Sequence, residues 1–105
     1  MTISLDLEEN EIKSLVEFAG KLAGKRVFEI GCGDGRLTWR YASQAAYVVA
    51  IDPTPENISQ AQENLPVELS DRVSFQALEL EEYVAQHPPH IQTNTFDLVL
   101  LAWSL

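Results

Sequence analysis

Apolar and polar residues follow two kinds of pattern along the chain, one typical of helices and one typical of strands. Residues 6–22 carry apolar side chains at roughly helical spacing, with Glu and Lys side chains between them, and this pattern predicts a helix. Residues 26–30 and 73–77 are short segments typical of strands. Residues 47–52 and 96–103 are apolar on both faces, as strands are when helices cover both sides of a parallel sheet.

Helices are predicted between these strands. The first begins near residue 34, where no helix breaker follows up to residue 42. Pro55 can open the next, because the first turn of a helix needs no amide proton there, and Pro66 should end it. A short acidic helix is predicted at residues 80–86, followed by a loop at residues 87–90.

Strands that alternate with helices predict a Rossmann-like, doubly wound α/β fold. We expect a parallel sheet with strand order 3-2-1-4, right-handed crossovers and helices on both faces. The site should lie at the carboxyl ends of strands 1 and 4, where the strand order reverses direction.

Composition narrows the possible partners. The 105 residues suffice for one domain, expected over residues 1–105, and their formal charge of -9 repels phosphate backbones and anionic membranes. We therefore expect neither nucleic acid nor a membrane as partner. The single cysteine, Cys32, excludes an internal disulfide, and the first residues lack the features of a signal peptide. These features favour a soluble cytoplasmic protein.

The candidate chemistry lies in a glycine-rich loop between the first strand and its helix, residues 29–35. Glycines occur where the backbone turns sharply or approaches a ligand, although a tight turn alone also favours them. Asp52 ends the second strand, 21 positions after Gly31, at the spacing of an acid that accepts hydrogen bonds from ribose hydroxyls. Glu79 follows the third strand but could belong, with neighbouring glutamates, to a solvated face.

The glycine spacing discriminates between cofactors. The nicotinamide fingerprint G-x-G-x-x-G requires glycine at position 36, where this chain has Arg36, and its third glycine comes one residue earlier at Gly35. A P-loop is excluded because no Gly-Lys-Ser or Gly-Lys-Thr follows the loop. A nicotinamide-dependent oxidoreductase therefore stays as a weaker alternative.

Four segments together resemble the class I S-adenosylmethionine-dependent methyltransferases, in particular the N-terminal, cofactor-binding part of type 11-like members. The resemblance covers residues 26–105. Its motifs are the acid with G-x-G-x-G, the second strand with its ribose-binding acid, the third strand with its adenine-side acid, and the fourth strand: Glu29–Gly35, Ala50–Glu56, Val73–Glu79 and Phe96–Leu101.

The resemblance implies which residues bind the methionine end of S-adenosyl-L-methionine. Gly31, Cys32 and Gly33 would line it with their backbone, and Gly35 completes the motif. Glu29 would stand near the cofactor's amino group, directly or through water. Cys32 is expected to serve as a small loop residue rather than as a nucleophile.

The resemblance also implies contacts to the adenosine. Asp52 would accept the ribose hydroxyls, Pro53 would touch the adenine, and Glu79 and Leu80 would flank its far side. The backbone near Ala102 would approach the sulfonium. An acidic site favours this cationic cofactor.

The acceptor and the catalytic residues are not assigned by the sequence, and a small-molecule acceptor is expected. Trp103 could contact substrate or belong to the core, and Trp39 and Tyr41 are expected to pack or to lie half exposed. His87 and His90 bracket two prolines, and a surface loop is favoured over a metal site.

Members of the resembled family continue beyond a fourth strand, so this chain is expected to be truncated there. The fourth strand would then be an exposed apolar edge, open to self-association. Alone, the chain is expected to bind cofactor weakly and to show no methyl transfer. A non-catalytic adenosyl-binding or interaction module that completes its sheet with a partner is the alternative function.

Overall fold

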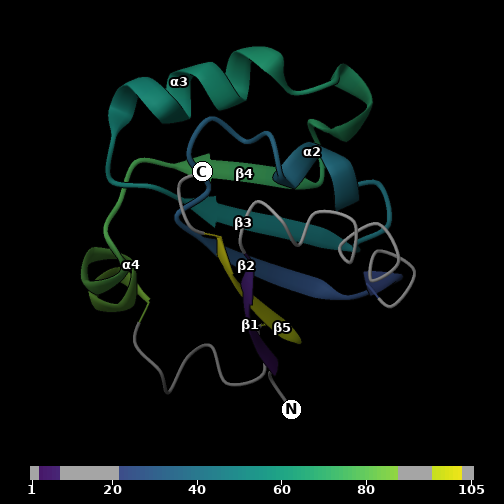
Figure 1. Ribbon diagram of the computed structural model, residues 1–105, viewed down its shortest axis with the longest axis horizontal. Helices are drawn as coiled ribbons and strands as arrows, with labels where there is room; N and C mark the ends of the chain where they lie inside the picture. The colour runs from purple at the N-terminus through teal and green to yellow at the C-terminus, as the bar shows by residue number, and fades with distance from the viewer. Residues whose placement is uncertain (1–2, 8–21, 88–95, 103–105) are drawn as a thin grey trace.

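The computed structural model describes residues 3–7, 22–87 and 96–102, arranged as one parallel sheet with helices beside it (Figure 1). A short 3₁₀ turn (Val67–Leu69) follows the longest of the helices. The strands are β1 (Ile3–Leu7), β2 (Arg26–Ile30), β3 (Tyr47–Ile51), β4 (Val73–Gln76) and β5 (Leu98–Ala102). The helices are α2 (Thr38–Tyr41), α3 (Pro55–Asn64) and α4 (Leu80–Gln86).

The sheet has the order β1-β5-β2-β3-β4, and all its strand pairs are parallel. The segment β4-β3-β2-β5 is the predicted order 3-2-1-4, so this prediction is confirmed. At the carboxyl end of the sheet, Ile30 of β2 pairs with Ile51 of β3 and with Leu101 of β5. The direction of the strand order reverses at β2, where the site was expected.

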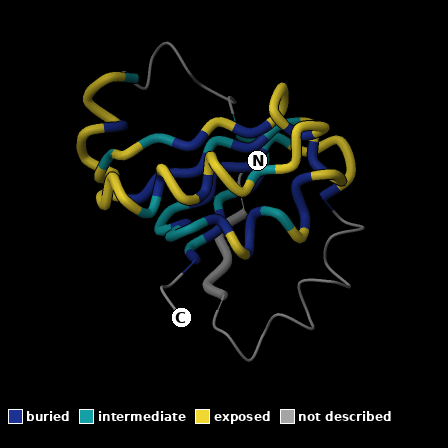
Figure 2. Tube along the Cα trace, turned by 90° about the horizontal axis from the view of Figure 1, so that it is seen from above, coloured by how far each residue is buried: buried dark blue, intermediate teal, exposed yellow. Residues whose placement is uncertain are grey.

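Side chains that alternate along the strands build two cores of unequal size. On one face, apolar residues of β2 to β5 pack with those of α2 and α3, including Tyr41 and Ala61. On the other face, Phe28 and Ile51 pack with Tyr83 of α4. Figure 2 shows buried strands between helical turns whose outer sides are exposed. Helices thus lie on both faces, as predicted.

The third glycine of the loop packs against the larger core. Gly35 has φ +84°, and a Cβ there would lie 3.0 Å from Ala61 Cβ, 3.0 Å from Trp39 Nε1 and 3.1 Å from Phe75 Cζ. Because those neighbours belong to α3, α2 and β4, a side chain at this position would push three elements apart.

An ion pair joins β2 to the segment before β5. Arg26 donates to Asp97 from Nε to Oδ2 at 3.0 Å and from Nη2 to Oδ1 at 2.9 Å, a bidentate pair. The backbone N–H of Arg26 also donates to Oδ2 at 2.9 Å. These hydrogen bonds hold the pKa of Asp97 well below its usual range. The pair fixes the amino ends of the strands, opposite the expected site.

Two expectations about the chain ends are wrong. Residues 6 and 7 belong to β1 and not to a helix, and the rest of that predicted helix up to residue 21 lies outside the described residues. The fourth predicted strand, β5, is not an exposed edge, because β1 pairs with it from Ile3↔Leu98 to Leu7↔Ala102 while β2 pairs on the other side. With its backbone groups paired on both sides, β5 offers no edge for self-association.

The first crossover helix is also shorter than predicted. The chain turns through residues 33–37 before α2 begins at Thr38.

Among the described residues, no helix combines the length and the apolar character needed to cross a membrane. Trp103 and His90 lie outside the described residues.

Candidate functional site

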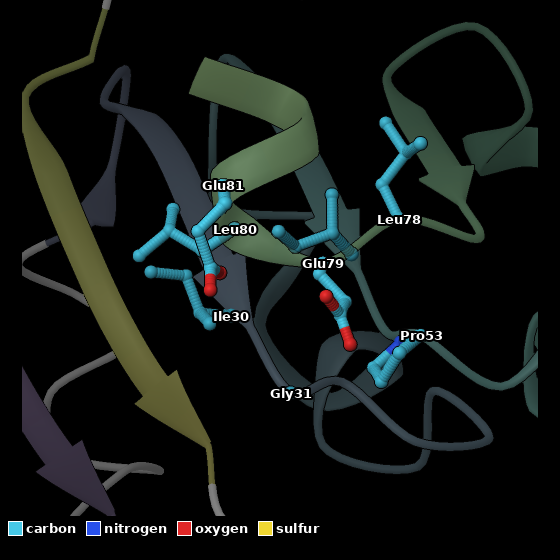
Figure 3. Close-up of a pocket in the computed structure, with 8 residues that line it drawn as sticks. Ile30, Gly31, Pro53, Leu78, Glu79, Leu80 and Glu81 are labelled. Atoms are coloured by element: carbon cyan, nitrogen blue, oxygen red, sulfur yellow. The ribbon is translucent and has the colours of Figure 1, made fainter. Parts of the chain in front are cut away.

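A cavity of about 250 Å³ opens at the carboxyl ends of β2 and β3, beside the start of α4 (Figure 3). It lies at the predicted reversal of the sheet. Its lining combines the last residues of the two strands with the loops that follow them and the first turn of α4: Ile30, Gly31, Ile51, Pro53, Leu78, Glu79, Leu80 and Glu81.

The glycine loop folds across the ends of β3 and β5 at Gly31. This residue has φ +80°, and a Cβ there would lie only 2.6 Å from the carbonyl oxygen of Ala102. The N–H groups of Gly31 and Cys32 both donate to the carbonyl of Ile51, at 2.9 and 3.1 Å. Glycine is therefore required for two reasons, the left-handed backbone and the close approach of β5.

Asp52 ties the loop to the end of β3. Its Oδ2 accepts the N–H of Gly33 at 3.0 Å and its Oδ1 accepts the N–H of Thr54 at 2.9 Å. The residue is only 8% exposed. An ionised carboxylate has about four acceptor sites, so each oxygen keeps the capacity for a further donor.

Glu29 is a fully buried acid at the base of the loop. Its Oε1 accepts hydrogen bonds from Thr38 Oγ1 and from Tyr41 Oη, both at 2.6 Å. Its Oε2 is also buried and has no hydrogen-bond partner among the described residues. Burial raises the pKa of Glu29, and the hydrogen bonds from the two hydroxyls lower it in part.

Cys32 has the environment of an unreactive thiol. It is buried, and its Sγ lies 3.6 Å from the carbonyl oxygen of Gly33. Burial raises the pKa of this thiol far above its usual range, and the nearby charges of Glu29 and Asp52 raise it further. Because the thiolate is the nucleophilic form, the structure agrees with a small loop residue and not with a nucleophile.

The opposite wall of the cavity is formed by the first turn of α4. Glu79 is the N-cap of this helix: its carboxylate accepts the backbone N–H of Glu82, and Glu82 Oε1 accepts the N–H of Glu79 at 2.9 Å. This reciprocal pair is a capping box. In Figure 3 the Glu79 carboxylate points toward Pro53. Leu80 is 40% exposed, so this wall is open to solvent.

The structure brings only part of the predicted site to the cavity. Gly31, Pro53, Glu79 and Leu80 line it. The carbonyl of Ala102 lies against Gly31, and Asp52 holds the loop from behind. Other predicted residues lie in the loop and beneath it without lining the cavity: Glu29, Cys32, Gly33 and Gly35.

Sequence reasoning did not assign some residues that line the cavity: Ile30, Ile51, Leu78 and Glu81. Ile30 and Ile51 are the last residues of their strands, which is a signal available in the sequence. Glu81 was noted only as part of an acidic run, and its place in the cavity follows from how α4 is capped.

Two other residues considered from the sequence, His87 and Tyr41, pack against neighbouring side chains. The ring of His87 stacks on Tyr83, with centroids 4.0 Å apart, and its Nδ1 lies 2.9 Å from the Tyr83 carbonyl oxygen. Within the described ranges, no group of His, Cys, Asp and Glu side chains has the arrangement of a metal site. Tyr41 is fully buried, as its predicted packing role requires.

Comparison with known proteins identifies the family. Residues 21–104 match a family model described as a methyltransferase domain. The chain is 35% identical over 81 residues to a mitochondrial ubiquinone biosynthesis O-methyltransferase of Bos taurus, which covers 75% of this chain and 20% of that protein. It is 36% identical over 66 residues to the 23S rRNA (uracil(1939)-C(5))-methyltransferase RlmD of Shewanella amazonensis, covering 63% of this chain and 15% of that protein.

A solved structure agrees with this match. The magnesium protoporphyrin IX methyltransferase of Synechocystis PCC 6803, determined with bound S-adenosylmethionine, superposes with a TM-score of 0.58 and 26% identity, over 68% of this chain and 36% of that one. The curated relatives are much longer, since this chain spans 15% of the RlmD protein and 31% of another ubiquinone biosynthesis O-methyltransferase, from Aromatoleum aromaticum.

The parallel sheet, its reversal at β2 and the glycine loop there define the class, a doubly wound α/β domain with its cavity at the carboxyl ends of the strands. Together with the matched family, they place the chain among the class I S-adenosylmethionine-dependent methyltransferases, to which it belongs. S-adenosyl-L-methionine is the cofactor of this family. The relatives' names include both a ubiquinone-pathway enzyme and an rRNA enzyme, so the absence of nucleic acid as a partner stays a prediction.

Proposed function

We propose that this chain binds S-adenosyl-L-methionine at the carboxyl ends of β2, β3 and β5 and belongs to an enzyme that transfers its methyl group to a small-molecule acceptor. The observation that carries the proposal is the arrangement at Gly31. There the loop leaves no room for a side chain, because it lies against the end of β5. Its N–H groups donate hydrogen bonds to the carbonyl of Ile51 at the end of β3. The family and the cofactor bound in the Synechocystis structure support the same cofactor here.

The donor groups of the site fit the adenosyl part of the cofactor. Asp52 has unused acceptor capacity on both carboxylate oxygens, which suits two neighbouring ribose hydroxyls. Pro53 and the apolar side chains of Ile30 and Leu78 offer surfaces for a flat aromatic base.

The charge of the site fits the rest of the cofactor. Glu79 and Glu81 are acidic, and none of the described residues that line the cavity is basic. Such a field favours a sulfonium cation and disfavours nucleotides with phosphate groups. Beneath the loop, Oε2 of Glu29 has no partner within the described part of the chain and provides an acceptor that suits an ammonium group.

Bound S-adenosyl-L-methionine supplies a methyl carbon already activated by its positive sulfur. Transfer of that carbon is an in-line displacement, so the protein has to hold donor and acceptor in one line and to exclude other orientations. In this proposal Asp52 fixes the ribose, the backbone at Gly31 fixes the amino-acid end, and the Ala102 carbonyl bounds the reacting end. No described residue is assigned as a general base.

A small-molecule acceptor is supported by charge. The chain carries a formal charge of -9, which opposes binding to a phosphate backbone. One relative is an enzyme of ubiquinone biosynthesis, and another is a methyltransferase of magnesium protoporphyrin, which supports an acceptor of this size. Label transferred from radioactive S-adenosylmethionine to total RNA, with none to small-molecule extracts, would contradict this part of the proposal.

The cofactor assignment is tested by thermal melting of the purified chain with S-adenosylhomocysteine, using NAD as the control ligand. A ligand at about a hundred times its dissociation constant adds about 2.7 kcal/mol to the free energy of unfolding. We expect S-adenosylhomocysteine to raise the melting temperature and NAD to leave it unchanged. A shift with NAD alone would support the oxidoreductase alternative instead.

A further inference from the structure

Two hydroxyl groups of α2 hold the same oxygen of Glu29. Thr38 and Tyr41 lie three positions apart on the helix, so their side chains lie on one face, the face that packs on β2. Both hydroxyls donate to Oε1 at 2.6 Å, and all three side chains are buried. Within the residues that the structure describes, the carboxylate is therefore held through one oxygen only.

The other oxygen is the unusual feature. Oε2 of Glu29 is buried and has no hydrogen-bond partner among the described residues. A buried acceptor left without a donor is costly, and a core that needed only a link between β2 and α2 would satisfy both oxygens or use an apolar pair. The arrangement suits a carboxylate that is fixed through one oxygen so that the other can receive a donor from a ligand.

We propose that Thr38 and Tyr41 are positioning residues for the cofactor: by holding Oε1 of Glu29 they keep Oε2 directed at the cofactor's ammonium group. This inference rests on the proposed function. The two hydroxyls also help to keep Glu29 ionised in a buried place, since hydrogen bonds to the charged form favour that form. Neither residue belongs to the glycine motif, and neither touches the cavity.

The direct test compares two ligands on the Tyr41→Phe variant of the full chain. S-adenosylhomocysteine carries the ammonium group, and 5′-methylthioadenosine has the same nucleoside without the amino-acid part. Loss of one hydrogen bond to a charged group should weaken S-adenosylhomocysteine about tenfold. Binding of 5′-methylthioadenosine should stay within about twofold of the original chain, because no contact to its atoms is lost.

Matched variants separate positioning from general damage. Tyr47→Phe removes a tyrosine hydroxyl at the amino end of β3, far from the cavity, and should change neither affinity. Thr38→Val removes the second hydroxyl with little change of shape and should reproduce the selective loss. Thr38→Ser keeps a hydroxyl and should restore most of the affinity for S-adenosylhomocysteine.

The pH dependence of S-adenosylhomocysteine binding distinguishes a positioning role from a purely structural one, because a purely structural role would leave it unchanged. An ionised Glu29 binds the ammonium and a protonated one does not, so affinity for S-adenosylhomocysteine should rise as the pH rises through the raised pKa of Glu29. Tyr41→Phe should move this rise to higher pH, because the ionised carboxylate loses a donor. The titratable groups that face Glu29 are Tyr41 and Cys32, and burial raises the pKa of both, so both stay protonated while Glu29 titrates.

The outcomes are distinguishable. Failure of the unaltered chain to bind either ligand would overturn the proposed function and this inference with it. If the unaltered chain binds but Tyr41→Phe and Thr38→Val weaken both ligands equally, or neither, the positioning role is wrong while the cofactor assignment stands. Selective loss of S-adenosylhomocysteine with a shifted pH profile is the result that the inference expects.

Discussion

The two walls of the cavity are built in opposite ways. On one side, the glycine loop is held by backbone contacts, with Gly31 against the Ala102 carbonyl and Asp52 bonded to the N–H groups of Gly33 and Thr54. On the other side, the first turn of α4 presents exposed side chains, with Leu80 40% exposed and Glu79 acting as the helix cap. The first wall is fixed by contacts to the backbone, whereas the second consists of exposed side chains, of which Glu79 is held by the capping box.

This difference indicates where the specificity resides. Main-chain positions fixed by neighbours on several strands cannot shift without moving the sheet, whereas exposed side chains change rotamer at little cost. We therefore expect the loop wall to determine whether the cofactor binds. The α4 wall should only modulate how tightly the base is held.

The largest effect is expected for Gly31→Ala. Its Cβ would lie 2.6 Å from the Ala102 carbonyl oxygen in a left-handed backbone, so the free energy of unfolding should fall by about 3 kcal/mol and cofactor binding should be lost. Gly24→Ala is the matched control, because Gly24 has φ +71° but nothing within 4 Å of the added Cβ. It should cost only about 1 kcal/mol in urea unfolding. Equal costs for the two variants would show that β5 does not constrain the loop.

The next effect is expected for Asp52→Asn. The amide keeps one acceptor but turns a donor toward an N–H group and removes the charge, so affinity for S-adenosylhomocysteine should fall between about tenfold and about a hundredfold by calorimetry. Asp71→Asn, an exposed residue at the opposite end of the sheet, should leave the affinity unchanged. Unchanged binding by Asp52→Asn would show that Asp52 does not bind the ribose hydroxyls.

A pH comparison probes the buried part of the loop wall. Burial raises the pKa of Glu29, so its contribution to stability is fully present below about pH 4 and is lost as the pH rises through the raised pKa. Glu29→Gln has no such titration. We expect the stability of Glu29→Gln relative to the original chain to increase with pH, measured by urea unfolding at several pH values. A difference independent of pH would contradict a buried, titrating carboxylate.

The smallest effects are expected on the α4 wall. Glu79→Gln keeps an acceptor for the helix cap, and Glu81→Gln removes only a charge beside the cavity. Each should change the affinity for S-adenosylhomocysteine by about threefold at most. If either variant lost as much affinity for S-adenosylhomocysteine as Asp52→Asn, the α4 wall would matter for binding as much as the loop wall, contrary to expectation.

Much of the fold could be predicted because local patterns determine it. The bounds of β2 and α4 coincide with the predicted segments. Helix breakers mark these bounds in the sequence, since Gly31 follows the strand and Pro88 comes soon after the helix. The strand β1 was missed although Ile3, Leu5 and Leu7 alternate with polar residues. Its pairing with β5 joins distant parts of the chain, which no local pattern specifies.

In the candidate site, too, features set by the local sequence could be predicted, and features set by packing between distant segments could not. The glycines at 31 and 35 could be found because backbone sterics restrict those positions to few residue types. The acid at 52 could be found because it ends a strand at a known spacing from the glycine loop. The hydrogen bonds from Thr38 and Tyr41 to Glu29 could not, because they depend on how α2 packs on β2. The capping role of Glu79 was not predicted, because Ser, Thr, Asp and Asn are the residues preferred at an N-cap, although Glu82 stands at the position where a capping box has its acid.

The central claim is that the cofactor binds at the carboxyl ends of the strands. The most direct measurement follows the backbone amide signals of the ¹⁵N-labelled chain by NMR during titration with S-adenosylhomocysteine. We predict that the largest shifts fall on Gly31, Cys32 and Gly33 and on the first turn of α4, while Tyr47 and Arg72 at the opposite end of the sheet stay unchanged. Shifts concentrated at Tyr47 and Arg72, or none in the glycine loop, would contradict the account.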